Sequence, residues 1–225
     1  GKRESVADIA RVLSKFNDII MARLFDHSHI LELAKFSSVP VINGLTDHNH
    51  PCQIVADAFT IIEKKGTLKD LKISYVGDGN NIVHSWFELA MVTPINLTVI
   101  CPEDFKPNLD LFDAVKKKGI SNVEIQHDPL DAIQGSDVVY TDVWASMGQK
   151  EEAEKRRQAF QNYQVNQNMM NNANPDAIFM HCLPAERGVE VTDSVCDSHN
   201  SVIFDQAENR MHAQNAIILK LMNAF

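Results

Sequence analysis

Two polar clusters of the sequence combine residue types that can bind and activate a small polar molecule. Asp142 begins the segment DVWASMG, where its carboxylate could cap the next segment or bind a ligand ammonium. Cys182 lies in the segment HCLP. A buried cysteine is usually an inert small hydrophobe, and a nucleophilic one needs an adjacent base. His181 precedes Cys182, but neighbours on a strand point to opposite faces, so covalent cysteine catalysis is not favoured.

The segment HNHPC at positions 48–52 allows two interpretations. His48 and His50 form a His-x-His pair, which can bind zinc, but no second cluster with matching spacing accompanies it. Alternatively, His50 donates a hydrogen bond to a bound oxygen just before a helix start, with Gln53 one turn later on the same side. We favour the second interpretation and expect no metal.

The segment GDGNN at positions 77–81 has three possible roles. It is a plain turn before a helix, a nucleotide loop, or a site where the free N–H groups of a helix start bind a carboxylate. It departs from G-x-G-x-x-G, and the acidic residue of the dinucleotide pattern is missing. A nicotinamide-dependent oxidoreductase is therefore disfavoured.

Basic residues fall into two groups. Arg210, in the segment AENR, could form an ordinary surface ion pair or serve a site. The runs Lys64-Lys65, Lys116–Lys118 and Arg156-Arg157 are typical of solvated helix faces and helix ends, and we predict no function for them.

Strands and helices must alternate to position these clusters. Apolar runs predict strands at Ile19–Arg23, Val39–Asn43, Lys72–Val76, Leu97–Cys101, Val123–Gln126, Val138–Thr141, Ile178–His181 and Val202–Asp205. Amphipathic stretches predict helices at Asp26–Phe36, Pro51–Lys65, Ile82–Met91, Leu130–Ile133, Glu151–Gln161 and Glu208–Phe225, another one ending at Gly119, and a helix remnant in Gly1–Ala10. This α/β pattern predicts a Rossmann-like parallel sheet with helices on both faces. Ligands bind at the carboxyl ends of such strands, where the polar clusters converge.

Composition excludes several classes of protein. The 225 residues carry a formal net charge of −9, which argues against nucleic acid as the main partner. No apolar run reaches the length of a membrane span. The four cysteines form no Cys-x-x-Cys pair, which indicates reduced thiols in a soluble intracellular protein, in the cytoplasm or an organelle lumen such as the mitochondrial matrix or plastid stroma.

Together, the motifs resemble one family. Five segments occur in a fixed order: HPCQ at His50–Gln53, DGNN at Asp78–Asn81, DVWASMG at Asp142–Gly148, HCLP at His181–Pro184 and AENR at Ala207–Arg210. Along essentially all 225 residues the chain resembles the ornithine carbamoyltransferases of the aspartate/ornithine carbamoyltransferase superfamily. The pairing of HCLP with SMG is specific, since aspartate carbamoyltransferases lack the SMG loop.

The resemblance implies a reaction and a set of roles. The family converts carbamoyl phosphate and L-ornithine to L-citrulline and phosphate, a step of arginine biosynthesis, without metal or organic cofactor. Arg23, His50 and Gln53 would hold carbamoyl phosphate, as would Cys182, Leu183 and Arg210. Asn81 and the Met147 backbone would hold the ornithine carboxylate, and Asp142 and Ser146 its α-ammonium. The catalytic residues would be Cys182, Arg210 and Asp142.

One departure from the family bears on activity. The Ser-Thr-Arg-Thr-Arg phosphate loop of the family occurs nowhere in these residues. We therefore expect an N-terminally truncated chain that makes little citrulline alone. The expected division is a partial carbamoyl-phosphate domain at 1–50, a connecting helix at 51–65, and an ornithine domain at 66–225 whose last helix, 208–225, packs back on the first domain. The resemblance also implies a homotrimer at full length. A non-catalytic amino-acid-binding homologue is the alternative.

Overall fold

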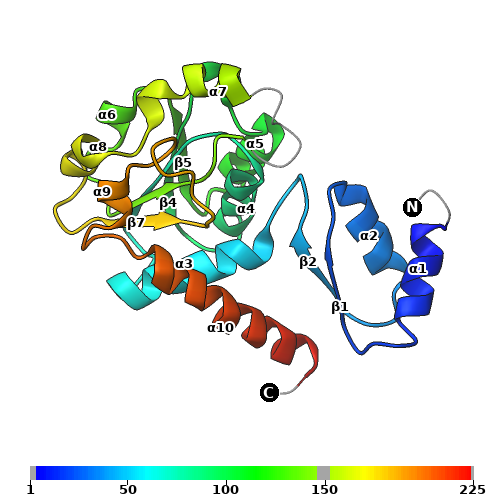
Figure 1. Cartoon of the computed structure of the whole chain (residues 1–225). Coiled ribbons are helices and arrows are strands. Elements are labelled where there is room, and N and C mark those ends of the chain that lie inside the picture. Colours follow the sequence, from blue (N-terminus) through cyan, green and yellow to red (C-terminus); the bar gives the residue numbers. More distant parts are fainter. Residues whose placement is uncertain (1–3, 146–152, 224–225) are drawn as a thin grey trace.

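Helices and strands alternate along the chain in the computed structural model, which describes residues 4–145 and 153–223 (Figure 1). The strands are β1 Ile20–Arg23, β2 Val41–Leu45, β3 Lys72–Val76, β4 Asn96–Ile100, β5 Asn122–Gln126, β6 Val138–Thr141 and β7 Ile178–His181. The helices are α1 Val6–Leu13, α2 His27–Phe36, α3 Pro51–Lys65, α4 Asn81–Ala90, α5 Leu109–Lys118, α6 Pro129–Ala132, α7 Ala153–Ala159, α8 Gln167–Asn172, α9 Asp193–Cys196 and α10 Ile203–Leu221, with short 3-10 turns η1 Glu103–Phe105 and η3 Gln161–Tyr163.

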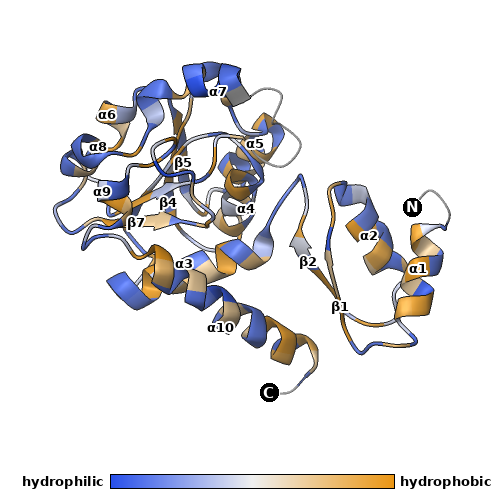
Figure 2. Cartoon of the chain, in the orientation of Figure 1, coloured by the Kyte–Doolittle hydropathy of each residue, from blue (hydrophilic) through white to orange (hydrophobic). Residues whose placement is uncertain are grey.

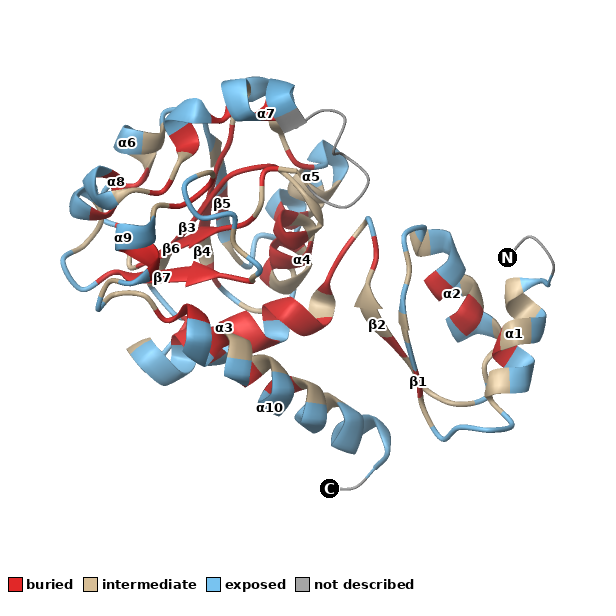
Figure 3. Ribbon diagram, in the orientation of Figure 1, coloured by how far each residue is buried: buried red, intermediate tan, exposed pale blue. Residues whose placement is uncertain are grey.

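The larger part of the molecule is built on a five-stranded parallel sheet of order β5-β4-β3-β6-β7. Its central strands are nearly continuous apolar runs, which is typical of a parallel sheet covered on both faces. All four residues of β6 and of β7 are buried, and buried positions run through the centre of this part in Figure 3. The predicted parallel α/β fold is therefore confirmed.

The smaller part contains β1 and β2, which pair in parallel, and the helices α1 and α2. Its core is small and includes Ala10, Ile30 and Leu33. The long helix α3 leads from β2 into the larger part (Figure 1). Pro51 occupies the first turn of α3, and Gly66 ends it in the left-handed conformation with φ of 80°.

Most predicted elements are present. The bounds of α3, β3, β6 and β7 agree with the prediction, and the other strands up to β5 differ by two residues or fewer at each end. The described part of the helix predicted at Glu151–Gln161 is α7. The predicted strand Val202–Asp205 is wrong: α10 already begins at Ile203, and Ser201 makes only an isolated bridge to Phe179.

The segment after Ser201 is helical because its buried residues follow a helical period. Ile203, Gln206, Asn209 and Ala213 share one buried face of α10, which packs along α3. Two of these four residues are polar, and hydrophilic positions recur along α10 in Figure 2. Asn209 Nδ2 donates to Thr60 Oγ1 at 3.1 Å, so polar contacts as well as apolar ones join the two helices.

Within residues 4–145 and 153–223, no helix combines the length and the apolar character that crossing a bilayer demands.

Candidate functional site

A cleft of about 830 Å³ lies at the carboxyl ends of the strands of both sheets. This is where parallel α/β sheets bind ligands. Eight of the predicted site residues line it: Arg23, His50, Gln53, Asn81, Asp142, Cys182, Leu183 and Arg210. The remaining two, Ser146 and Met147, lie outside the described residues. Residues up to 187 positions apart in the sequence thus meet at one cleft, as the topology predicts.

Asp142 is the polar centre on the larger part's side of the cleft. It follows β6 directly and is mostly buried. Asn80 Nδ2 donates to its Oδ2 at 2.7 Å, and the Cys182 thiol donates to its Oδ1 at 3.0 Å. Burial raises the pKa of the Cys182 thiol well above its usual range, and Asp142 raises that pKa further. Cys182 is therefore a protonated hydrogen-bond donor, which agrees with the prediction against covalent catalysis.

The argument that strand alternation separates His181 from Cys182 is wrong. β7 ends at His181, so alternation does not extend to Cys182, and one donor atom from each of Asp142, His181 and Cys182 lies within 4.8 Å of the others. The His181 ring is nevertheless engaged elsewhere. Its Nδ1 accepts from the Leu183 N–H at 2.8 Å, and its Nε2 lies 3.1 Å from the fully buried Glu190. Nε2 therefore carries the proton, and the ring is not placed to act as a base toward the thiol.

This cluster of Asp142, His181 and Cys182 is the one group of three or more metal-capable side chains among the described residues. All three side chains already make hydrogen bonds within the protein. The two histidines of the His-x-His segment diverge instead of converging on one ion. His48 Nε2 lies 3.5 Å from Glu88, whereas His50 lines the cleft.

His50 is a neutral donor or acceptor on the wall of the cleft. Burial lowers its pKa to about 4, and the charges of Arg210 and Arg23 lower it too. Its Nδ1 is buried and has no hydrogen-bond partner among the described residues. A buried polar atom without a partner is costly unless a ligand satisfies it. His50 lines the cleft, and its hydrogen bond to a bound oxygen stays a prediction.

The GDGNN segment forms a turn that opens α4. Asn80 caps the helix, with its Oδ1 accepting from the Ile82 N–H at 3.0 Å. Asn81 Nδ2 donates to the Thr46 carbonyl oxygen at 2.8 Å and so ties α4 to the loop after β2. An amide nitrogen carries two hydrogens, so one N–H of Asn81 is left over from this bond.

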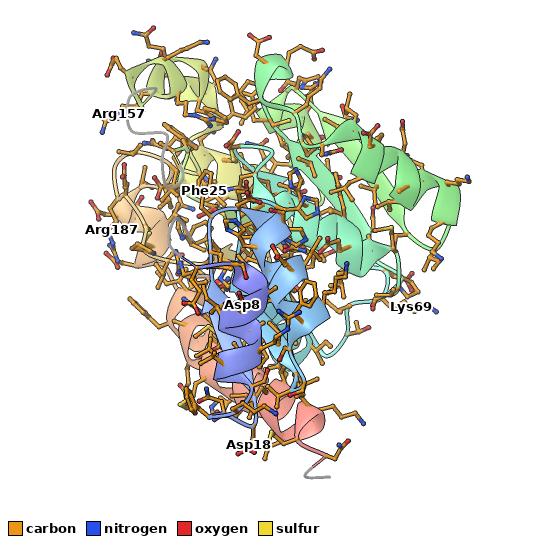
Figure 4. All side chains as sticks on the ribbon, turned by 90° about the vertical axis from the view of Figure 1, so that its right-hand side faces the viewer. Asp8, Asp18, Phe25, Lys69, Arg157 and Arg187 are labelled. Carbon is orange, nitrogen blue, oxygen red and sulfur yellow. The ribbon has the colours of Figure 1, made fainter. Side chains whose placement is uncertain are left out.

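Sequence reasoning missed Arg156, which was assigned to a solvated helix face. Arg156 is in fact buried, whereas Arg157 is exposed and points away from α7 (Figure 4). Arg156 Nη1 lies 2.8 Å from Asp78 Oδ2 and donates to the Trp144 carbonyl at 2.9 Å, and the guanidinium lies 4.9 Å from the centre of the Phe105 ring. It thus joins the loops after β3 and β6. No signal in the charged stretch distinguishes Arg156 from its neighbour.

A second missed residue is Asp57 on α3. It is fully buried and accepts hydrogen bonds from Gln53, Gln206 and Tyr140. A signal did exist, since Asp57 lies four residues after Gln53 and therefore on the same helix face.

Side chains of both charges line the cleft. Arg23 and Arg210 supply positive charge, and neutral His50 supplies a polar group. These groups suit an anion. Asp142 supplies a carboxylate suited to an ammonium group. The arrangement can therefore bring an anionic and a cationic small molecule together and surround the point between them with hydrogen-bond donors.

Family models match almost the whole chain. Residues 1–63 match the carbamoyl-P binding domain of aspartate/ornithine carbamoyltransferase, and residues 69–221 match the Asp/Orn binding domain. The chloroplastic ornithine carbamoyltransferase of Pisum sativum is 61% identical over 222 residues, which are 99% of this chain and 59% of that protein. An ornithine carbamoyltransferase of Thermococcus kodakarensis is 53% identical, with 97% and 70% covered. The chain thus spans about three fifths of the pea protein.

Solved structures agree with these matches. Ornithine carbamoyltransferase from Pyrococcus furiosus superposes with a TM-score of 0.93 at 50% identity, covering 99% of this chain and 72% of that one. Ornithine transcarbamoylase from Giardia lamblia gives a TM-score of 0.89 at 35% identity, with 97% and 75% covered.

Proposed function

Because the chain belongs to the aspartate/ornithine carbamoyltransferase family, we propose that it forms the ornithine side and part of the carbamoyl phosphate side of an ornithine carbamoyltransferase. The reaction joins carbamoyl phosphate to L-ornithine and yields L-citrulline and phosphate. One observation carries this proposal: a single cleft is lined both by Asp142, with its Cys182 neighbour, and by the cationic residues Arg23 and Arg210. The relatives do not favour a non-catalytic amino-acid-binding homologue.

In this proposal the nucleophile is the δ-amine of ornithine. A lysine-like amine has a pKa of about 10.4, so its neutral form lies roughly 4.6 kcal/mol uphill at pH 7. Asp142 holds the α-ammonium, and the Cys182 thiol borders the reacting amine. The neutral amine attacks the carbamoyl carbon, a C–N bond forms, and the C–O bond to phosphate breaks. The amine proton leaves to solvent.

Charge develops on the carbamoyl oxygen as the amine attacks. Arg210 and His50 line the cleft and are the donors proposed to stabilise that oxygen. Arg23, His50 and Gln53 contribute to binding carbamoyl phosphate, and Leu183 adds its backbone carbonyl. Leu183 has a φ of 56°, a left-handed conformation that is costly for a residue with a side chain. The hydrogen bond from its N–H to His181 helps to hold that conformation.

The test is citrulline formation from carbamoyl phosphate and L-ornithine by the protein as its gene encodes it, with residues 1–225 alone for comparison. Citrulline should accumulate in proportion to phosphate. Binding of ornithine without any citrulline would overturn the proposed activity and support the non-catalytic homologue.

The pH dependence provides an independent prediction. At subsaturating ornithine, kcat/KM should rise about tenfold per pH unit between about pH 6.5 and 8.5, because the neutral fraction of the amine rises by that factor. His50 adds no step in this window, since its pKa of about 4 leaves it neutral throughout. A rate that is level across the window would contradict the assignment of the δ-amine as nucleophile.

Exchange of Asp142 tests the ammonium site. Asp142→Asn should weaken ornithine binding by on the order of 1.5–3 kcal/mol, since it removes a charge-assisted hydrogen bond. Calorimetric titration with L-ornithine in the presence of phosphate measures the change. Asp113→Asn, on the exposed face of α5, is the matched control and should bind like the parent. Unchanged ornithine affinity in Asp142→Asn would show that Asp142 does not hold the ammonium.

Three further features belong to this proposal. The division into a partial carbamoyl-phosphate domain at 1–50, a connecting helix at 51–65 and an ornithine domain at 66–225 is supported by the two sheets that α3 separates. A homotrimer is proposed from the family resemblance, and light scattering should give three times the mass of one chain. A reducing intracellular compartment is supported by the four buried free cysteines.

A further inference from the structure

The Asp57 carboxylate sits where three elements of the fold meet. It belongs to α3 and is fully buried. Gln53 Nε2 donates to its Oδ1 at 2.8 Å, Gln206 Nε2 on α10 donates to the same oxygen at 2.7 Å, and the Tyr140 hydroxyl on β6 donates to Oδ2 at 2.9 Å. When ionised, the Asp57 carboxylate can only accept hydrogen bonds. All three partners donate to it.

This geometry determines which way the Gln53 amide faces. A carboxylate cannot donate, so only the nitrogen of Gln53 can point at Asp57. The Gln53 oxygen then lies on the other side of the amide carbon, and Gln53 lines the cleft. Among the described residues, the bond to Asp57 is the one hydrogen bond of the Gln53 side chain. Gln53 therefore presents a hydrogen-bond acceptor to a ligand.

Asp57 is ionised at neutral pH. Burial raises its pKa to about 6, while the three hydrogen bonds and the charge of Arg210 lower it. Tyr140 stays protonated, because burial and the charge of Asp57 raise its pKa well above the usual range. Above pH 6, the carboxylate accepts and all three partners donate.

We propose that Asp57 is a positioning residue that holds the Gln53 amide oxygen toward the cleft and thereby makes the site prefer a carbamoyl phosphate to an acyl phosphate. This inference rests on the proposed function. In carbamoyl phosphate the amino group supplies the N–H donors. Acetyl phosphate has a methyl group in that place and nothing to donate. An acceptor from Gln53 therefore favours the first ligand, whereas an amide turned by 180° would present N–H groups to an N–H donor.

A second chain of hydrogen bonds from the same carboxylate supports its positioning role. Gln206 Nε2 donates to Asp57, and Gln206 Oε1 accepts from the His181 N–H at 2.9 Å. His181 precedes Cys182, whose thiol borders Asp142. Asp57 thus sets Gln53 directly and, through Gln206, is linked to the backbone that carries Cys182.

The experiment compares two ligands on the gene-encoded protein. Calorimetry gives the affinities of carbamoyl phosphate and acetyl phosphate for the parent and for Asp57→Ala. Loss of the carboxylate frees the Gln53 amide to turn, so the carbamoyl-to-acetyl preference should fall about tenfold. Acetyl phosphate affinity should stay within about twofold. A purely structural role would weaken both ligands equally.

Two variants serve as controls. Tyr140→Phe removes a donor from the same carboxylate but leaves the Gln53 contact in place, so it should keep the parental preference. Asp57→Asn should also keep most of the preference, because its oxygen can still accept from Gln53 while its nitrogen donates to the Tyr140 hydroxyl. An unchanged preference in folded Asp57→Ala overturns the inference.

A measurement on the parent protein covers the case in which Asp57→Ala does not fold. The Gln53 side-chain amide signal, assigned by its absence in Gln53→Met, should shift at its carbonyl carbon with carbamoyl phosphate and not with acetyl phosphate. Equal shifts with both ligands overturn the inference. A parent protein that binds carbamoyl phosphate but makes no citrulline contradicts the proposed function alone, because the preference of the site can still be measured.

Discussion

Replacing Arg210 by glutamine is expected to lower the kcat of citrulline formation by about 10²–10³-fold, the usual cost of removing one donor to a developing oxyanion. Arg210 lines the cleft from α10, close enough to His50 and Asp57 for its charge to lower the pKa of both. The donated hydrogen bonds strengthen as negative charge forms on the carbamoyl oxygen. Steady-state kinetics on the gene-encoded protein should therefore show a loss mainly in kcat, with a smaller change in the KM for ornithine.

The matched control for this experiment is Arg157→Gln. It removes the same charge from a helix, but Arg157 is exposed and does not line the cleft (Figure 4). Its kcat should equal that of the parent. If Arg210→Gln raised the KM for carbamoyl phosphate and left kcat intact, Arg210 would be a binding residue only, and the oxyanion role would be wrong.

An Arg156→Met variant should unfold with a free energy about 3–5 kcal/mol lower than the parent, because it leaves the buried carboxylate of Asp78 without its ion-pair partner. Both side chains are nearly inaccessible, with 8% and 9% of their surface exposed, so solvent screens this pair little. The guanidinium also holds the Trp144 carbonyl and covers the Phe105 ring. Urea unfolding monitored by tryptophan fluorescence measures the loss.

The pH dependence of this loss has a definite sign. Burial raises the pKa of Asp78 above its ordinary value, and Arg156 opposes that rise. Without Arg156 the folded-state pKa rises further, so the penalty is full above that pKa and shrinks as the pH falls through it. Adding Asp78→Asn to Arg156→Met should recover part of the stability at pH 7, whereas a deficit independent of pH would show that lost packing is the cause. Arg157→Met should stay within about 0.5 kcal/mol of the parent.

Local patterns were sufficient for most of the fold. Most strands of the larger sheet are short apolar runs, and each strand is followed within three residues by a Gly, Pro or Asp. Since parallel strands share one carboxyl edge, the convergence of Asp142, Cys182 and Asn81 followed from the topology. The start of α3 was equally clear, because Pro51 is favoured in the first turn of a helix.

Features that depend on distant partners could not be predicted. Arg156 and Arg157 look alike in sequence, and only the position of Asp78, after another strand, decides that one is buried. The start of α10 was misjudged for a related reason. The residues Val202–Phe204 are apolar enough for a strand, but the packing of α10 on α3 selects the helix. The partnership of Asp57 with Gln206 spans 149 positions and has no local signature.

That long span has a consequence for the order in which the site is assembled on the ribosome. A chain emerges from its N-terminus, so α3, with Asp57, Thr60 and Glu63, is available for packing long before α10 exists. Gln206 and Asn209, which bind those residues, are translated together with Arg210, and Gln206 follows Asp57 by 149 positions. Until then the Asp57 carboxylate lacks one of its three donors, and the cleft lacks the charge of Arg210. Completion of the α3–α10 contact and completion of the site are thus a single late event, and a chain stalled before α10 would expose both defects to the cell's proteases at once.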